Sequence, residues 1–105
     1  MQQTRIDDMA IAKDIFLHIT SPTRLSCGVR EAKGGSEGGR PFLLIRVGGS
    51  THKDYVKIVL NRNNKYALTH MRVFDVAGHT QVFAEISDIY PGELSHMLSK
   101  VVKAH

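Results

Sequence analysis

The sequence predicts an α+β fold, in which one helix near each end of the chain packs on one face of an antiparallel sheet of about five strands. Two observations predict it. Apolar residues recur at helical spacing near both ends, and between these stretches short apolar runs are separated by turns rich in glycine and asparagine. A length of 105 residues and a hydrophobic share of 42% suit a single globular domain over residues 1–105.

The first predicted helix begins after Asp7 and Asp8, whose negative charge favours a helix N-terminus. Its apolar stripe consists of residues that recur at helical spacing, namely Ile11, Ile15, Phe16 and Ile19. Pro22 disfavours helical geometry in Ser21, the residue before it, so we expect the helix to end there.

A first strand is expected directly after this helix. Leu25, Cys27 and Val29 alternate with small or polar residues, which is the period of a half-buried strand. The stretch 34–39 contains four glycines and predicts a loose hairpin loop.

Four further strands are expected where apolar runs are bounded by turn residues, at 42–47, 55–60, 66–74 and 81–86. The asparagine-rich stretch 61–64 tolerates left-handed backbone geometry and predicts a turn. The last two strands are expected to be joined across Gly78.

The closing helix is predicted to begin near Pro91, because the missing N–H of a proline would be unpaired in the first turn anyway. Its apolar stripe consists of Leu94, Met97, Leu98, Val101 and Val102. Ile58 and Leu98 lie in the middle of their stripes and are expected in the core. Both helices should cover one face of the sheet, which leaves the other face to water or to a partner.

The sequence predicts a cytoplasmic protein that has no membrane partner. A single cysteine, Cys27, cannot form an internal disulfide. Asp7 and Asp8 stand where a signal peptide would carry positive charge. The strongly apolar runs, such as Phe42–Ile45, are far too short to cross a bilayer.

No motif indicates catalysis, and we expect no catalytic residue, no metal and no cofactor. The segment Gly48–Lys53 lacks the spacing of a phosphate-binding loop, so a hairpin is expected there. None of the six histidines stands three or four positions from another histidine or from Cys27, as metal ligands on a helix would. Cys27 is expected to be a small buried side chain. An enzyme therefore remains only as an alternative.

Charge is the most informative feature of the sequence. Residues 22–74 hold ten basic and three acidic residues, whereas the whole chain has a net charge of +4. Strand alternation predicts a basic open sheet face that would bind single-stranded nucleic acid or an acidic partner, and its candidate binding residues are Arg24, Arg46, Lys57, Tyr66 and Arg72. The same residues could instead only keep the open face soluble.

The order of elements resembles small uncharacterised proteins of phages, plasmids and other mobile elements. The matching segments are Ile11–Ile15, Tyr55–Asn61 and Val82–Tyr90. The resemblance implies a non-enzymatic accessory or anti-defence protein that acts on a protein or nucleoprotein target. The alternatives are a nucleic-acid-binding protein that uses the basic sheet face, and an enzyme. The two edges of an open sheet also favour a homodimer.

Overall fold

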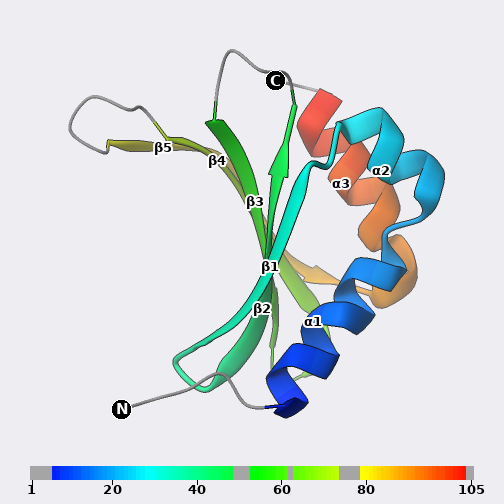
Figure 1. Ribbon diagram of the computed structural model, residues 1–105, viewed down its shortest axis with the longest axis vertical. Helices are drawn as coiled ribbons and strands as arrows, with labels where there is room; N and C mark the ends of the chain where they lie inside the picture. Colours follow the sequence, from blue (N-terminus) through cyan, green and yellow to red (C-terminus); the bar gives the residue numbers. More distant parts are fainter. Residues whose placement is uncertain (1–5, 49–52, 62, 74–78, 104–105) are drawn as a thin grey trace.

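Two layers, one of helices and one of strands, make up the fold in Figure 1, a computed structural model that describes residues 6–48, 53–61, 63–73 and 79–103. In chain order the elements are α1 (Ile6–His18), α2 (Ser21–Cys27), β1 (Glu31–Glu37), β2 (Arg40–Val47), β3 (Lys53–Leu60), β4 (Tyr66–Val73), β5 (Thr80–Ile89), the 3-10 helix η1 (Pro91–Glu93) and α3 (Leu94–Lys103). The strands form one antiparallel sheet in the order β1-β2-β3-β4-β5. The helices lie on one face of it, so the predicted α+β class is confirmed.

The strand predicted over residues 25–29 is wrong, because Ser21–Cys27 form the helix α2. Thr20 precedes this helix in extended geometry, and Pro22 lies in its first turn, where a missing N–H costs no helical hydrogen bond. Gly28 ends the helix with a left-handed φ of 66°. Pro22 thus opens a second helix two residues after the first has ended. Cys27 is buried as expected, although it belongs to a helix.

Three hydroxyl groups join the start of α2 to α3. The Ser95 hydroxyl donates to Thr23 Oγ1 over 2.6 Å, and Thr20 Oγ1 donates to the same oxygen over 3.0 Å. The backbone N–H of Thr20 donates to Ser95 Oγ over 3.2 Å. Thr23 and Ser95 are 72 positions apart in the sequence. The cluster therefore closes the helix layer between two distant parts of the chain.

The loose loop predicted at 34–39 is also wrong, because Glu31–Glu37 form the edge strand β1 and only Gly38 and Gly39 make the turn. At Gly34 and Gly35 of β1, neighbouring side chains lie too close to leave room for a Cβ. A Cβ on Gly34 would lie 2.7 Å from the Cβ of Ala12 in α1, and one on Gly35 would lie 2.5 Å from the Phe42 ring on β2. Contacts on both faces hold a glycine-rich segment in strand geometry that its local sequence disfavours.

The core fills the space between the sheet and the helices. Its buried apolar side chains are Ala12, Ile15, Ile19, Cys27, Leu43, Ile45, Val47, Val56, Ile58, Tyr66, Leu68, Ile89, Leu94, Leu98 and Val101. Ile58 and Leu98 are fully buried, which confirms both as core residues. The predicted stripes of the first and last helices supply much of this set. Two polar residues, Asp54 and His70, are buried with them.

The strands β4 and β5 pair with two irregularities, which lie between Tyr66 and Leu68 and between His70 and Met71. Asp88, in the first of these, has a left-handed φ of 57°. Such bulges increase the twist of a strand pair, and the sheet curves so that its open face is concave (Figure 1). The long edge strand β5 is therefore irregular, which discourages pairing with another chain.

The predicted turn at 61–64 is confirmed, since the N–H of Asn64 donates to the carbonyl of Asn61 over 3.0 Å and Asn64 has a φ of 62°. The predicted connections at 49–52 and across Gly78 lie outside the described residues. Within the described part of the chain, no helix has the length and apolar character that crossing a membrane requires.

Candidate functional site

One face of the sheet carries no helix, and we call it the open face (Figure 1). Directly paired residues of antiparallel strands project to the same side. Because Leu43, Ile45, Val56 and Ile58 point to the helices, their neighbours along the strands point the other way. The open face so defined consists of Glu31, Lys33, Glu37, Arg40, Phe42, Leu44, Arg46, Tyr55, Lys57, Val59, Ala67, Thr69, Met71, Val73, Val82 and Glu85.

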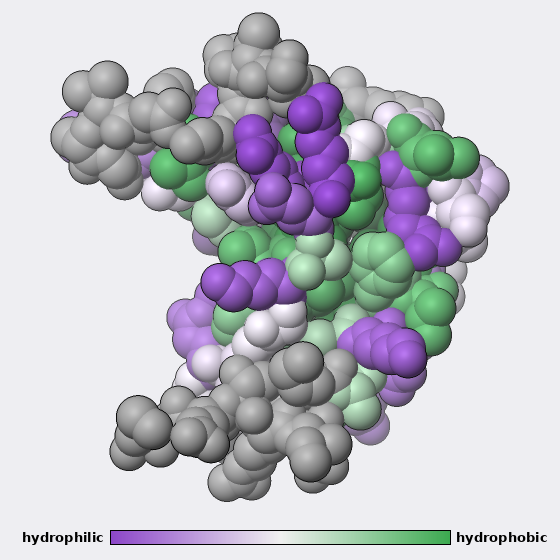
Figure 2. Space-filling model, viewed as in Figure 1, coloured by the Kyte–Doolittle hydropathy of each residue, from purple (hydrophilic) through white to green (hydrophobic). Residues whose placement is uncertain are grey.

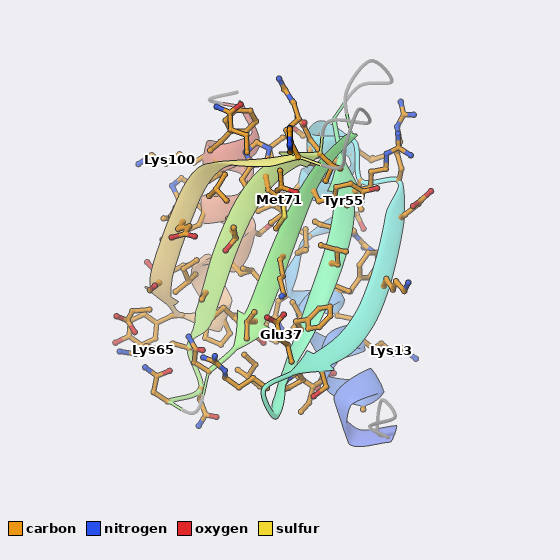
Figure 3. All side chains as sticks on the ribbon, turned by 90° about the vertical axis from the view of Figure 1, so that its left-hand side faces the viewer. Lys13, Glu37, Tyr55, Lys65, Met71 and Lys100 are labelled. Atoms are coloured by element: carbon orange, nitrogen blue, oxygen red, sulfur yellow. The ribbon has the colours of Figure 1, made fainter. Side chains whose placement is uncertain are left out.

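A hollow of about 450 Å³ lies at one end of the open face, and it is lined by Glu31, Lys33, Leu44, Arg46, Tyr55, Met71 and Val73. These residues come from four neighbouring strands, β1 to β4. Figure 2 shows the molecule hollowed on this side, and Figure 3 shows Tyr55 and Met71 next to each other near one end of the sheet, far from Glu37. Leu44, Tyr55, Met71 and Val73 are partly exposed and form the apolar part of the hollow.

Two basic side chains border this apolar part. Lys33 is paired in register with Leu44, and Arg46 is paired with Tyr55 on one side and with Glu31 on the other. Within the described ranges of the chain, the side chains of Lys33 and Arg46 form no ion pair and no side-chain hydrogen bond. Both cations are thus available to a ligand.

Charges at the opposite end of the open face are satisfied within the chain. Lys57 forms an ion pair with Glu37, and its ammonium group lies 4.8 Å from the centre of the Phe42 ring. The Arg40 guanidinium donates to Asn61 Oδ1 over 3.1 Å. The two ends of the face therefore differ in chemistry, and among the described side chains it is the hollow that combines uncommitted cations with partly exposed apolar groups.

The predicted binding residues do not form one surface. Arg46 and Lys57 lie on the open face as expected. Tyr66 and Arg72 project to the helix side, since β4 is turned so that Leu68, rather than Met71, faces the core. The patch expected from Arg46, Lys57 and Arg72 on neighbouring strands is therefore wrong.

The fifth candidate, Arg24, lies outside the sheet altogether. It belongs to α2, where its guanidinium lies 4.6 Å from the centre of the Phe16 ring and donates to Ser21 Oγ over 2.8 Å. These contacts on the helix layer separate Arg24 from the open face.

Arg72 has a structural partner on the helix side. Its Nε donates to Asp54 Oδ1 over 2.7 Å and its Nη2 to Asp54 Oδ2 over 3.1 Å, and this bonding raises the pKa of the Arg72 guanidinium further above its ordinary range. The Nε2 of His70 lies 3.9 Å from Asp54 Oδ2, and the Phe83 ring contacts both His70 and Arg72. Asp54 and His70 are buried, and this group joins β3, β4 and β5 on the helix side of the sheet.

Sequence reasoning missed most of the hollow. Of the residues that line it, only Arg46 belongs to the predicted binding residues. The signal available in the sequence was the alternation along β2, in which Leu44 and Arg46 lie on the face opposite the buried Leu43 and Ile45.

Comparison with known proteins identifies no relative: no protein-family model, no curated protein and no solved structure matches the chain. The resemblance to proteins of mobile elements therefore stays a prediction. In the parts of the chain that the structure describes, no group of three or more histidine, cysteine, aspartate or glutamate side chains could hold a metal ion.

Proposed function

We propose that this protein is a non-enzymatic binding protein that holds a partner protein against the open face of its sheet. The single observation that carries the proposal is the hollow over β1 to β4, where apolar side chains of Leu44, Tyr55, Met71 and Val73 remain partly exposed. Covering apolar surface contributes about 25 cal/mol per Å² removed from water toward association, against the entropic cost of binding. The volume of the hollow, about 450 Å³, also falls in the usual range of ligand sites.

Nucleic acid is the weaker candidate because the open face is not strongly basic. Among the side chains that the structure describes, its charged residues are the basic Lys33, Arg40, Arg46 and Lys57 and the acidic Glu31, Glu37 and Glu85. A phosphate backbone that tracked across the sheet would meet all three carboxylates, and Lys57 is already paired with Glu37. A protein partner, which offers charges of both signs and apolar side chains, suits this mixture better.

Site-specific photocrosslinking in the native host tests the proposal. A benzophenone amino acid placed at Met71 would lie in the hollow, and the same amino acid at Leu25 would lie on α2, where the leucine is 84% exposed. We expect adducts from position 71 that protease removes and nuclease does not, and none of comparable yield from position 25. Equal adducts from both positions, or none from position 71, would contradict the proposal.

The same experiment distinguishes a protein partner from the alternative, a nucleic acid. Nuclease-sensitive adducts at position 71, together with oligonucleotide retention that weakens steeply with salt, would favour a nucleic-acid-binding protein. A mobile-element origin, an anti-defence role, a cytoplasmic location and a homodimer remain predictions. Light scattering at high concentration would check the last of these.

A further inference from the structure

We infer that the hollow binds a short segment of the partner protein in which an acidic side chain stands next to apolar ones. This inference rests on the proposed function and adds the chemistry of the partner. It follows from three features of the hollow: the charges along its border, the character of its apolar part and its extent across the sheet.

The charges along the border favour a carboxylate. Lys33 and Arg46 have no anionic partner within the described residues, although Glu31 stands beside Arg46 in register. A guanidinium can take both oxygens of a carboxylate, and such a pair is stronger where neighbouring apolar groups exclude water. Arg46 is half-buried whereas Lys33 is exposed, so a carboxylate should bind more strongly to Arg46 than to Lys33.

Glu31 limits how much negative charge the hollow accepts. It lies on the edge strand directly opposite Arg46, and a ligand with closely spaced negative charges would be repelled there. One or two carboxylates fit two cations and one anion, whereas a polyphosphate chain does not. The carboxylate of Glu31 therefore also favours a peptide over a nucleic acid in the same hollow.

The apolar part of the hollow favours aliphatic or aromatic side chains next to that carboxylate. Met71 is unbranched and adapts to irregular shapes, while Tyr55 offers a flat ring beside it. Leu44 and Val73 complete the surface. A purely acidic segment would leave these side chains in water, so it would gain little from the site.

The extent of the hollow sets the length of the segment. Four strands spaced about 4.8 Å apart span about 14 Å, which corresponds to about four residues in extended form at about 3.3 Å per residue. We therefore expect a core motif of about four residues that runs across the strands.

Selection of random twelve-residue peptides displayed on phage tests the inference without knowledge of the natural partner. The chain would be immobilised as wild type, as Arg46→Glu and as Lys100→Glu, in which the exposed lysine lies on α3. We expect wild type and Lys100→Glu to enrich peptides with Asp or Glu next to Leu, Ile, Phe or Met. Arg46→Glu should abolish that acidic enrichment, and a synthetic enriched peptide should bind Arg46→Gln about tenfold more weakly than wild type.

Each result bears on the inference. Apolar peptides that compete at the hollow but show no acidic bias would overturn the inference and leave the proposed function intact, because crosslinking at Met71 tests that function separately. No enrichment above a bare surface, or an acidic bias that Arg46→Glu does not change, would also overturn it. Thermal melting of the wild type and of the three variants shows that a lost preference does not reflect a lost fold.

Discussion

Asp54 on β3 and Arg72 on β4 face each other across the sheet, and the Arg72 guanidinium donates to both oxygens of the Asp54 carboxylate, over 2.7 and 3.1 Å. The pair lies on the helix side, next to the buried ring of His70. Arg72 shares this side of β4 with the buried Leu68 and His70. Met71 and Val73 alternate with them, so they lie on the open face and line the hollow.

Replacing Asp54 by asparagine should lower the melting temperature, because the amide offers the guanidinium one acceptor oxygen and no charge. Asp14→Asn is the matched control, since Asp14 is exposed on α1. We expect Asp54→Asn to reduce the free energy of unfolding clearly more than Asp14→Asn does in urea titrations. Equal effects would show that the pair contributes nothing beyond a surface charge.

Replacing Leu98 by alanine should reduce the free energy of unfolding by about 2–5 kcal/mol, since the side chain is fully buried between α3 and the sheet. Leu25→Ala removes the same atoms from a leucine that is 84% exposed, so it should change the free energy of unfolding by less than about 0.5 kcal/mol. Chemical denaturation of both variants checks the difference. Similar midpoints would contradict the assignment of α3 to the core.

Replacing Gly34 by alanine should destabilise the protein by about 1–3 kcal/mol, because the new Cβ would approach the Cβ of Ala12 to 2.7 Å. Gly92→Ala is the control, since a Cβ there meets nothing within 4 Å. A double-mutant cycle with Ala12→Gly should show coupling, as the second change removes the clash. Additive effects would mean that α1 does not pack against β1 at this point.

The stability of the protein should fall in alkali because of Tyr66. Burial, and secondarily the charge of Asp14, raise the pKa of the Tyr66 phenol above its ordinary value near 10. The folded state thus holds the proton more tightly than the unfolded state. The resulting stability is complete below about pH 10 and is lost as the pH rises through the folded pKa.

The variant Tyr66→Phe cannot lose a phenolic proton, so its stability should decline less than that of the wild type as the pH rises above about 10. Tyr90→Phe serves as the control, because this tyrosine is 57% exposed. Urea titrations at several pH values measure how steeply the free energy of unfolding falls with pH in the wild type and in both variants. If the wild type and Tyr66→Phe lost stability in parallel, the Tyr66 phenol would not be the group that causes the loss.

Much of the fold could be predicted because its long elements carry strong periodicity. The stripes around Ile15 and Leu98 fix two helices, and the alternation of β2 and β3 fixes two central strands. Their inward and outward faces were both foreseen, which is why Arg46 and Lys57 were placed correctly.

The remaining elements depend on tertiary contacts that local sequence does not contain. Seven residues are too few to establish helical periodicity in α2, and Pro22 can stand at the start of a helix or after its end. The strand β1 is held by close contacts of Gly34 with Ala12 on α1 and of Gly35 with the Phe42 ring on β2. In β4 both alternating sets contain apolar residues, so periodicity could not decide between Leu68 and Met71 as the buried one.

The hydroxyl cluster of Thr20, Thr23 and Ser95 has a consequence for the order in which the molecule assembles. Each strand pairs with its neighbour in sequence, so the sheet can grow hairpin by hairpin, whereas the contact between α2 and α3 joins residues 72 positions apart. The helix layer should therefore close late on the folding pathway. Stopped-flow kinetics would show this as Leu98→Ala accelerating unfolding while leaving the folding rate nearly unchanged.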